Sequence, residues 1–178
     1  MHNISIVNMI QDKLNLDKRD NTIIQMLQKD PNTSQEEIAK ELKLSQPSVW
    51  ARIRNLKEKG IIKNIAGMDF KTVDLDLVIV DVSATNTQAV IDEFKDCPFF
   101  INALVTSGKF NVCLFFTGEN LKHIEGIVNH HLRSNSLVKD VDLRVVITAS
   151  KSFVMPLNLD CTNNNQKNCK QECKKCIG

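Results

Sequence analysis

Four of the chain's six cysteines lie close together near its C-terminal end, at Cys161, Cys169, Cys173 and Cys176. Cysteine thiolates bind zinc and iron–sulfur clusters, and four of them complete the coordination of either. On a helix, Cys169, Cys173 and Cys176 would fall at positions i, i+4 and i+7, with their sulfur atoms directed toward one point. The residue types and their spacing therefore predict a metal centre in this segment.

The spacing C-x7-C-x3-C-x2-C favours a 4Fe–4S cluster over zinc. Structural zinc usually takes two pairs of ligands with about two to four residues inside each pair, and only one such pair is present here. Three closely spaced cysteines with a remote fourth suit a cluster better. The C-x3-C-x2-C part is similar to the cluster loop of radical SAM enzymes, although nothing else in the chain is. Cys161 as fourth ligand would close the cluster, which favours sensing or electron transfer. Zinc is the alternative, followed by disulfides or free thiols.

Residues 152–178 are expected to form a tail outside any domain core. From residue 157 onward the composition shifts to Asn, Lys, Gln and Cys, with Leu157, Leu159 and Ile177 as the only large aliphatic residues. So little apolar surface cannot order a segment by burial. A bound metal would then be the centre that orders the tail, because ligation and folding are coupled.

A second segment with functional spacing, residues 33–62, predicts a helix-turn-helix. Thr33 and Ser34 each precede a glutamate by three residues, so either can form a capping box that starts a helix. Ser45 is suited to cap a second helix, which ends at Gly60. Two short helices joined by a tight turn are the layout that places the second helix in the major groove of DNA.

The second of these helices, from Gln46 to Lys59, is the expected recognition helix. Val49, Ile53 and Leu56 fall at i, i+4 and i+7 and predict its core face. We expect base edges to be contacted by Gln46, Ser48, Ala51 and Asn55, phosphates by Arg52, Arg54 and Lys57, and the DNA backbone or the edge of the domain by Trp50.

Three further elements are expected around this pair. Residues 1–15 carry apolar positions that hint at an amphipathic helix, and residues 17–28 predict a helix with Ile23, Ile24 and Leu27 on its core face. A strand is expected to begin at Ile61.

The charge distribution supports a first part that faces DNA. Residues 1–65 contain 11 Lys or Arg and 8 Asp or Glu, a net charge of +3. Residues 66–157 contain 8 and 11, a net charge of −3, and residues 158–178 contain 4 and 2, a net charge of +2. The overall charge of +2 thus conceals a basic first part and an acidic second part.

The composition also bears on compartment and on catalysis. Residues 1–15 lack the basic start and long apolar core of an export signal, and we expect a cytoplasmic protein with no membrane partner. The reducing cytoplasm disfavours disulfides between the tail cysteines. The chain has no glycine-rich cofactor loop or plausible catalytic triad, so an enzyme is not expected.

The stretch LDKRDNTIIQMLQKDPNTSQEEIAKELKLSQPSVWARIRNLKEKGIIK resembles the start of the Lrp/AsnC, or feast/famine, family of transcription regulators. The resemblance continues to about residue 151, and residues 1–15 and 158–178 lie outside it. It implies a winged helix-turn-helix domain at residues 16–64, a linker at 65–75 and a ferredoxin-like effector and oligomerisation domain at 76–151. It also implies binding to palindromic double-stranded DNA as a homodimer, with higher oligomers such as octamers.

Independently of this resemblance, residues 77–148 predict a β-α-β-β-α-β order. Strands are expected at residues 77–83, 99–107, 111–117 and 141–148, with helices at 87–95 and 121–132. This order is that of a ferredoxin-like sandwich with an antiparallel sheet. The fold class is therefore α+β.

The hairpin at residues 108–111 departs from the resemblance. Family members that bind amino acids often have Gly, Tyr and Asp here, whereas this chain has Gly108, Phe110 and Asn111 and contains no tyrosine. An amide lacks the full charge that would hold an ammonium group. Effector contacts at these three residues would be weak, and we expect a plain turn.

The sequence thus predicts a DNA-binding transcription regulator of the Lrp/AsnC type that senses redox state or iron through a 4Fe–4S cluster. One alternative is a regulator with a structural zinc tail that senses a small molecule such as an amino acid. A remote alternative is a cluster-bearing electron-transfer protein.

Overall fold

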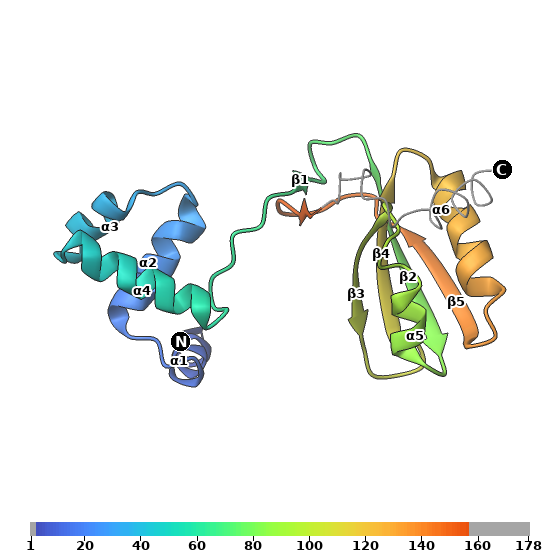
Figure 1. Ribbon diagram of the computed structural model, residues 1–178, viewed down its shortest axis with the longest axis horizontal. Helices are drawn as coiled ribbons and strands as arrows, with labels where there is room; N and C mark the ends of the chain where they lie inside the picture. Colours follow the sequence, from blue (N-terminus) through green and yellow to red (C-terminus); the bar gives the residue numbers. More distant parts are fainter. Residues whose placement is uncertain (1–2, 157–178) are drawn as a thin grey trace. The chain divides into compact units, whose positions relative to one another are not determined.

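A computed structural model describes residues 3–156 of the protein, with side chains from residue 8 onward. The chain divides into two compact units, residues 1–64 and residues 65–178 (Figure 1). The four cysteines of the expected metal centre, Cys161, Cys169, Cys173 and Cys176, lie outside the described residues.

The first unit is built from helices. They are α1 (Asn3–Lys13), α2 (Lys18–Lys29), α3 (Gln35–Leu42) and α4 (Gln46–Glu58). The last three of these helices share one core of buried side chains, formed by Ile23, Ile38, Ala39, Val49, Ile53 and Leu56. This core confirms the apolar stripes that the helical periodicity predicts.

Local hydrogen bonds fix where the helices begin. Ser34 accepts from the backbone N–H of Glu37 while the Glu37 carboxylate accepts from Ser34 N–H, which makes the capping box expected for α3. Lys43 adopts the left-handed conformation at φ 52° and turns the chain between α3 and α4. Gly60, at φ 69°, ends the unit's last helix with a backbone that favours glycine.

The expected strand at Ile61 does not form. Ile61 and Ile62 lie in a bend, and their side chains pack against the core of the first unit. Their N–H groups both point back to the carbonyl of Leu56. The helix core therefore uses these apolar side chains in place of a β-ladder.

The second unit contains a four-stranded antiparallel sheet in the order β3-β4-β2-β5. Its chain order is β2 (Asp76–Ala84), α5 (Thr87–Asp92), β3 (Phe100–Val105), β4 (Val112–Gly118), α6 (Leu121–Val128), a five-residue π-helical turn (Asn129–Arg133) and β5 (Val138–Val145). This is the predicted β-α-β-β-α-β topology. Strand β5 begins three residues before the predicted strand at 141–148, and α5 ends three residues before the end of the predicted helix at 87–95.

One face of the sheet packs on α5 and α6 around a continuous apolar core. Alternate residues of β2 and β4 point into it because successive side chains of a strand face opposite sides. The fully buried positions are Val78, Val80, Val82, Val90, Val112, Leu114, Phe116, Ile124, Val128 and Leu132. Phe94 closes the core, and its ring meets that of Phe116 edge-on at a centroid distance of 5.1 Å.

A separate two-stranded sheet joins distant parts of the chain. β1 (Met68–Asp69) pairs antiparallel with β6 (Val154–Met155). Residues 65–75, expected as a linker, therefore contain a strand, and so do residues 152–156, expected as part of the tail. Among the described residues, no helix is both long enough and apolar enough to cross a membrane.

Two N-cap serines in the first unit allow the contribution of a helix cap to stability to be measured with a matched control. Ser34 closes a capping box, whereas the Ser45 hydroxyl makes no cap bond and instead lies 2.7 Å from the Ser48 hydroxyl. We expect Ser34→Ala to lower the free energy of unfolding by about 1 kcal/mol, measured by denaturant titration. Ser45→Ala should cost less than half as much, and an equal loss for both variants would contradict the assignment of the cap.

Candidate nucleic-acid interface

Helix α4 presents one buried face and a broad exposed one. Val49, Ile53 and Leu56 are buried against α2 and α3. The side chains on the rest of the helix are therefore held toward solvent. Of the residues expected to meet DNA, those that are exposed are Gln46, Ser48, Trp50, Ala51, Arg54, Asn55 and Lys57.

Arg52 is the exception, because it is already bound to carboxylates of α2. Its Nη1 atom lies 2.8 Å from Oδ2 of Asp17 and 2.7 Å from Oδ1 of Asp20. Asp17 is the N-cap of α2 and forms a reciprocal capping box with Asp20. Arg52 therefore ties α4 to the first turn of α2, a positioning role that the sequence does not predict.

The same contacts set the ionisation of Asp17. Partial burial would raise its pKa, but hydrogen bonds from the Asp20 N–H and from the Arg52 guanidinium outweigh this and lower the pKa. Asp17 is therefore ionised at neutral pH and completes the ion pair.

Trp50 and Arg54 form a pair on an exposed flank of α4. The guanidinium carbon of Arg54 lies 5.3 Å from the centroid of the Trp50 ring, and its Nε donates to Glu58 at 2.7 Å. Half of Trp50 is exposed, and the side chain of Arg54 is 61% exposed. Both contacts are made by the guanidinium group of Arg54, whose remaining N–H groups can donate to a phosphate.

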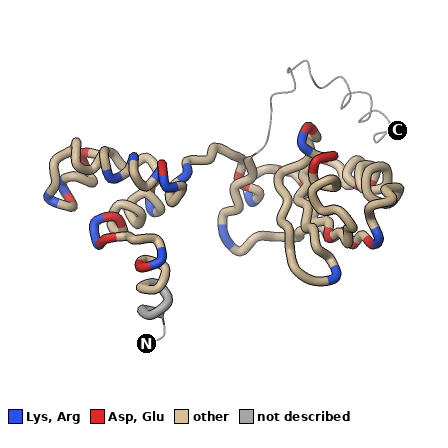
Figure 2. Tube along the Cα trace, turned by 60° about the horizontal axis from the view of Figure 1, so that its bottom comes forward, with Lys and Arg blue, Asp and Glu red and all other residues tan. Residues whose placement is uncertain are grey.

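Charge in the first unit is mixed rather than uniformly basic (Figure 2). Asp17 and Asp20 share a single positive charge, that of Arg52, and Glu58 is paired with Arg54. Lys57, Lys59 and Lys63 continue the basic character at the end of α4.

The hairpin at residues 108–111 has a structural role in the second unit. The Asn111 side chain accepts from Ala84 N–H and donates to Ala84 C=O, each at 2.8 Å, and so bridges β4 and β2. Thr106 donates to the carbonyl of Phe110, and Gly108 adopts φ 116°. The amide of Asn111 is thus used by the backbone, which agrees with the plain turn expected from its sequence.

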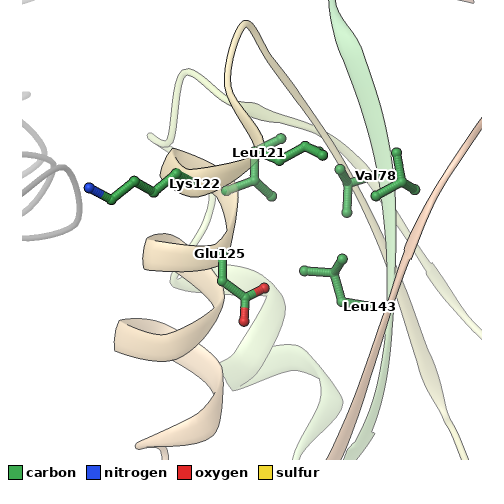
Figure 3. A pocket seen from close by; sticks show the side chains of 7 residues that line it. Val78, Leu121, Lys122, Glu125 and Leu143 are labelled. Atoms are coloured by element: carbon green, nitrogen blue, oxygen red, sulfur yellow. The ribbon is translucent and has the colours of Figure 1, made fainter.

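The second unit also holds a cavity of about 300 Å³ between α6 and the sheet. Figure 3 shows Val78 and Leu143 of the sheet opposite Leu121 and Glu125 of α6, with Lys122 pointing away. The Glu125 carboxylate is bonded to Arg133, so the lining that faces the space is mainly apolar. None of the hairpin residues 108–111 lines this cavity.

Within residues 3–156, no three His, Cys, Asp or Glu side chains converge as a metal site. Cys113, in β4, has its pKa raised to about 11, first by burial and then by its hydrogen bond to Asp81. A thiol held protonated in this way is a poor metal ligand. The expectation of a metal centre therefore rests on the tail cysteines.

The geometry of α2, α3 and α4 defines a helix-turn-helix DNA-binding protein. Residues 16–63 match the family model described as winged helix-turn-helix DNA-binding. The HTH-type transcriptional regulator LrpC of Bacillus subtilis is 32% identical over 124 residues, which cover 65% of this chain and 83% of that protein. The chain therefore belongs to the Lrp/AsnC family of transcription regulators.

Another relative and two solved structures are similar to this chain over about three quarters of its length. The transcriptional regulator AzlB of Bacillus subtilis is 24% identical over 146 residues, covering 78% of this chain and 93% of that protein. The structure of Bacillus subtilis LrpC matches with a TM-score of 0.64 at 26% identity, covering 76% of this chain and 97% of that one. The structure of AsnC from E. coli also matches with a TM-score of 0.64, at 15% identity, covering 76% and 95%.

Sequence reasoning missed the partners of Arg52, although a signal was present. Asp17 and Asp20 lie at the start of a helix that must pack beside α4, and an arginine one position away from the buried Ile53 can reach them. The pairing of β1 with β6 had no comparable signal, because each strand is only two residues long.

Arg52 and Arg54 provide a matched test of the ion pair. Arg52→Ala leaves two carboxylates without their cation, and we expect the free energy of unfolding to fall by about 1 kcal/mol, a value reduced by the exposure of Asp17. Arg54→Ala, which removes only an exposed pair with Glu58, should change it by less than about 0.5 kcal/mol.

The pH dependence of the free energy of unfolding tests the same ion pair. Because the pKa of Asp17 is lowered in the folded protein, the contribution of the ion pair is present at neutral pH and is lost as the pH falls through that lowered value, below about 3.9. Asp17→Asn should flatten this acid limb of the stability curve. An acid limb that is the same in wild type and variant would contradict the pairing.

Proposed function

We propose that this DNA-binding regulator reads a palindromic operator through α4 as a homodimer, and that a 4Fe–4S cluster on its four tail cysteines reports redox state or iron supply. The observation that supports the DNA-reading part is the geometry of α4, whose buried stripe leaves Gln46, Ala51 and Asn55 exposed. A helix held in this way can place its side chains at base edges in the major groove.

The contacts of α4 divide its basic residues into two groups. Arg54 and Lys57 are exposed and suited to phosphates, whereas Arg52 holds α4 against α2. The Trp50 ring contacts the guanidinium of Arg54, and its exposed half would pack on the DNA backbone. Two such units in a dimer would bind half-sites separated by about one helical turn or a multiple of it.

The sensing part of the proposal rests on the tail sequence. Cys161, Cys169, Cys173 and Cys176 supply the four thiolates that a 4Fe–4S cluster needs. When bound, such a cluster supplies one-electron redox chemistry and sensitivity to oxidants. The lysines at 167, 170, 174 and 175 would offset its negative charge, and loss of the cluster would remove the group that orders the tail.

Two other uses of the chain are tested by the same preparations. A structural zinc ion on the same thiolates would leave sensing to a small molecule, for which the apolar cavity beside α6 is a candidate site. A cluster used for electron transfer would not change DNA affinity on oxidation. Relatives named as transcription regulators favour the regulatory proposal over the latter.

Salt dependence tests the division of basic residues on α4. Removal of one phosphate-binding side chain should reduce the slope of log K against log salt concentration by about 0.9. We expect Arg54→Ala to reduce the slope by about this amount on any DNA sequence, while Arg52→Ala leaves the slope unchanged. Arg133→Ala, which removes an arginine paired with a carboxylate in the second unit, is the control. A reduced slope for Arg52→Ala would restore the phosphate contact suggested by the sequence.

Anaerobic purification tests the cluster. We expect a brown protein that contains iron and sulfide, and replacement of the four tail cysteines by serine should abolish both. Replacement of Cys97 and Cys113 by serine is the matched control and should retain them. A colourless protein with zinc would support the structural alternative, and equal DNA affinity before and after exposure to air would contradict the sensing role.

A further inference from the structure

The two-stranded sheet of β1 and β6 ties the chain that leaves the DNA-binding unit to the end of the described chain. Met68 lies opposite Met155, and Asp69 lies opposite Val154. The N–H of Phe70 extends the pairing by donating to the carbonyl of Phe153 at 3.0 Å. We use the name clip for residues 67–70 together with residues 152–155.

The Asp69 carboxylate holds the clip from the side. It accepts from the Ser152 hydroxyl at 2.8 Å and from the Phe153 N–H at 3.1 Å. It also accepts from the Lys71 N–H at 3.1 Å, which turns its own strand. The bond from Ser152, followed by those from the two backbone N–H groups, lowers the pKa of Asp69. The carboxylate is therefore charged, and charge-assisted hydrogen bonds are the stronger kind.

Gly67 allows the two halves of the clip to approach closely. A Cβ atom at this position would lie 2.4 Å from the carbonyl oxygen of Met155 and 2.8 Å from a methyl group of Val154. Met155 is itself completely buried. The clip is therefore a packed contact in which even one added methyl group has no room.

The position of the clip in the chain determines how much chain is free. Ile61 and Ile62 are packed on the first unit, and the clip begins at Gly67, so residues 63–66 are the segment that neither holds. If the clip opens, the free segment extends to the start of β2 at Asp76. At about 3.4 Å per extended residue, the reach grows from roughly 14 Å to roughly 45 Å.

Each opened tether gains about 30 Å, so the two tethers of a dimer together gain up to about 60 Å, which exceeds the spacing of about 34 Å that one turn of DNA puts between half-sites. We propose that the clip is a length switch: closed, it restricts the half-site spacing that the two DNA-binding units of a dimer can reach, and open, it relaxes that restriction. The inference rests on the proposed dimer on DNA. Residues 157–178 follow β6 closely in the sequence, so a ligand or partner bound by that segment could act on the clip.

Two variants open the clip by different physical means. Asp69→Ala removes the acceptor of three hydrogen bonds, and Gly67→Val introduces a side chain where there is no space. Asp74→Ala is the matched control, because it removes the same charge from the same connection at an exposed position outside the clip. Hydrogen exchange at the Phe70 amide reports whether the clip is open.

The experiment measures binding of the full-length protein to duplexes with half-sites separated by one, two or three turns and by half-integral turns, and to a duplex with a single half-site. We expect wild type and Asp74→Ala to prefer one spacing by about tenfold or more, because a short tether cannot span the others. Both opened variants should exchange the Phe70 amide faster and bind all spacings within about threefold, with unchanged affinity for the single half-site.

Each remaining outcome overturns the inference. An unaltered spacing preference in variants with fast Phe70 exchange would show that tether length does not govern spacing. Unaltered exchange in both variants would show that Asp69 and Gly67 do not hold the clip. Failure of wild type to bind any duplex, including the single half-site, would refute the proposed function itself, which is a different result from binding without spacing preference.

Discussion

Burial of a three-residue stripe on α4 is the constraint on which the interface depends. Val49, Ile53 and Leu56 remove apolar surface from water against α2 and α3, and each such burial is worth roughly 1.5–3 kcal/mol. A rotation of α4 about its axis would expose this stripe, so the helix has one favourable orientation. The side chains of α4 that are proposed to contact DNA are those that this orientation leaves exposed. The buried core therefore determines which side chains of α4 are exposed.

Ion pairs add a second constraint on the placement of α4, beyond the burial of its apolar stripe. The core sets the rotation of α4, whereas Arg52 sets its position relative to the first turn of α2 through Asp17 and Asp20. The capping box of α2 and the ion pair use the same two carboxylates, so the start of one helix and the placement of another are linked. Arginines two positions apart on one helix consequently serve different purposes: Arg52 faces a neighbouring helix, and Arg54 faces solvent.

Much of this architecture could be predicted from sequence because it depends on local periodicity. The helix core, a capping box at Thr33 or Ser34, the helix end near Gly60 and the ferredoxin-like order of elements follow from patterns that each segment carries by itself. The predictions that failed concern segments whose structure depends on contacts with residues outside the segment. The sequence predicts a strand from Ile61, but in the structure Ile61 packs on the helix core and forms no strand. The partner of β1 lies more than eighty residues away, and no local pattern specifies a pairing at that separation.

Trp50 gives the molecule an optical property that follows from its composition and fold together. The chain contains one tryptophan and no tyrosine, and the indole is half-exposed on the outer side of α4. Emission excited at the long-wavelength edge of tryptophan absorption therefore originates from a single side chain on the exposed part of α4, because the eight phenylalanines do not absorb there. Indole emission responds to solvent polarity and to stacking. Binding of a ligand at the exposed part of α4 would therefore change the intrinsic fluorescence of the unlabelled chain.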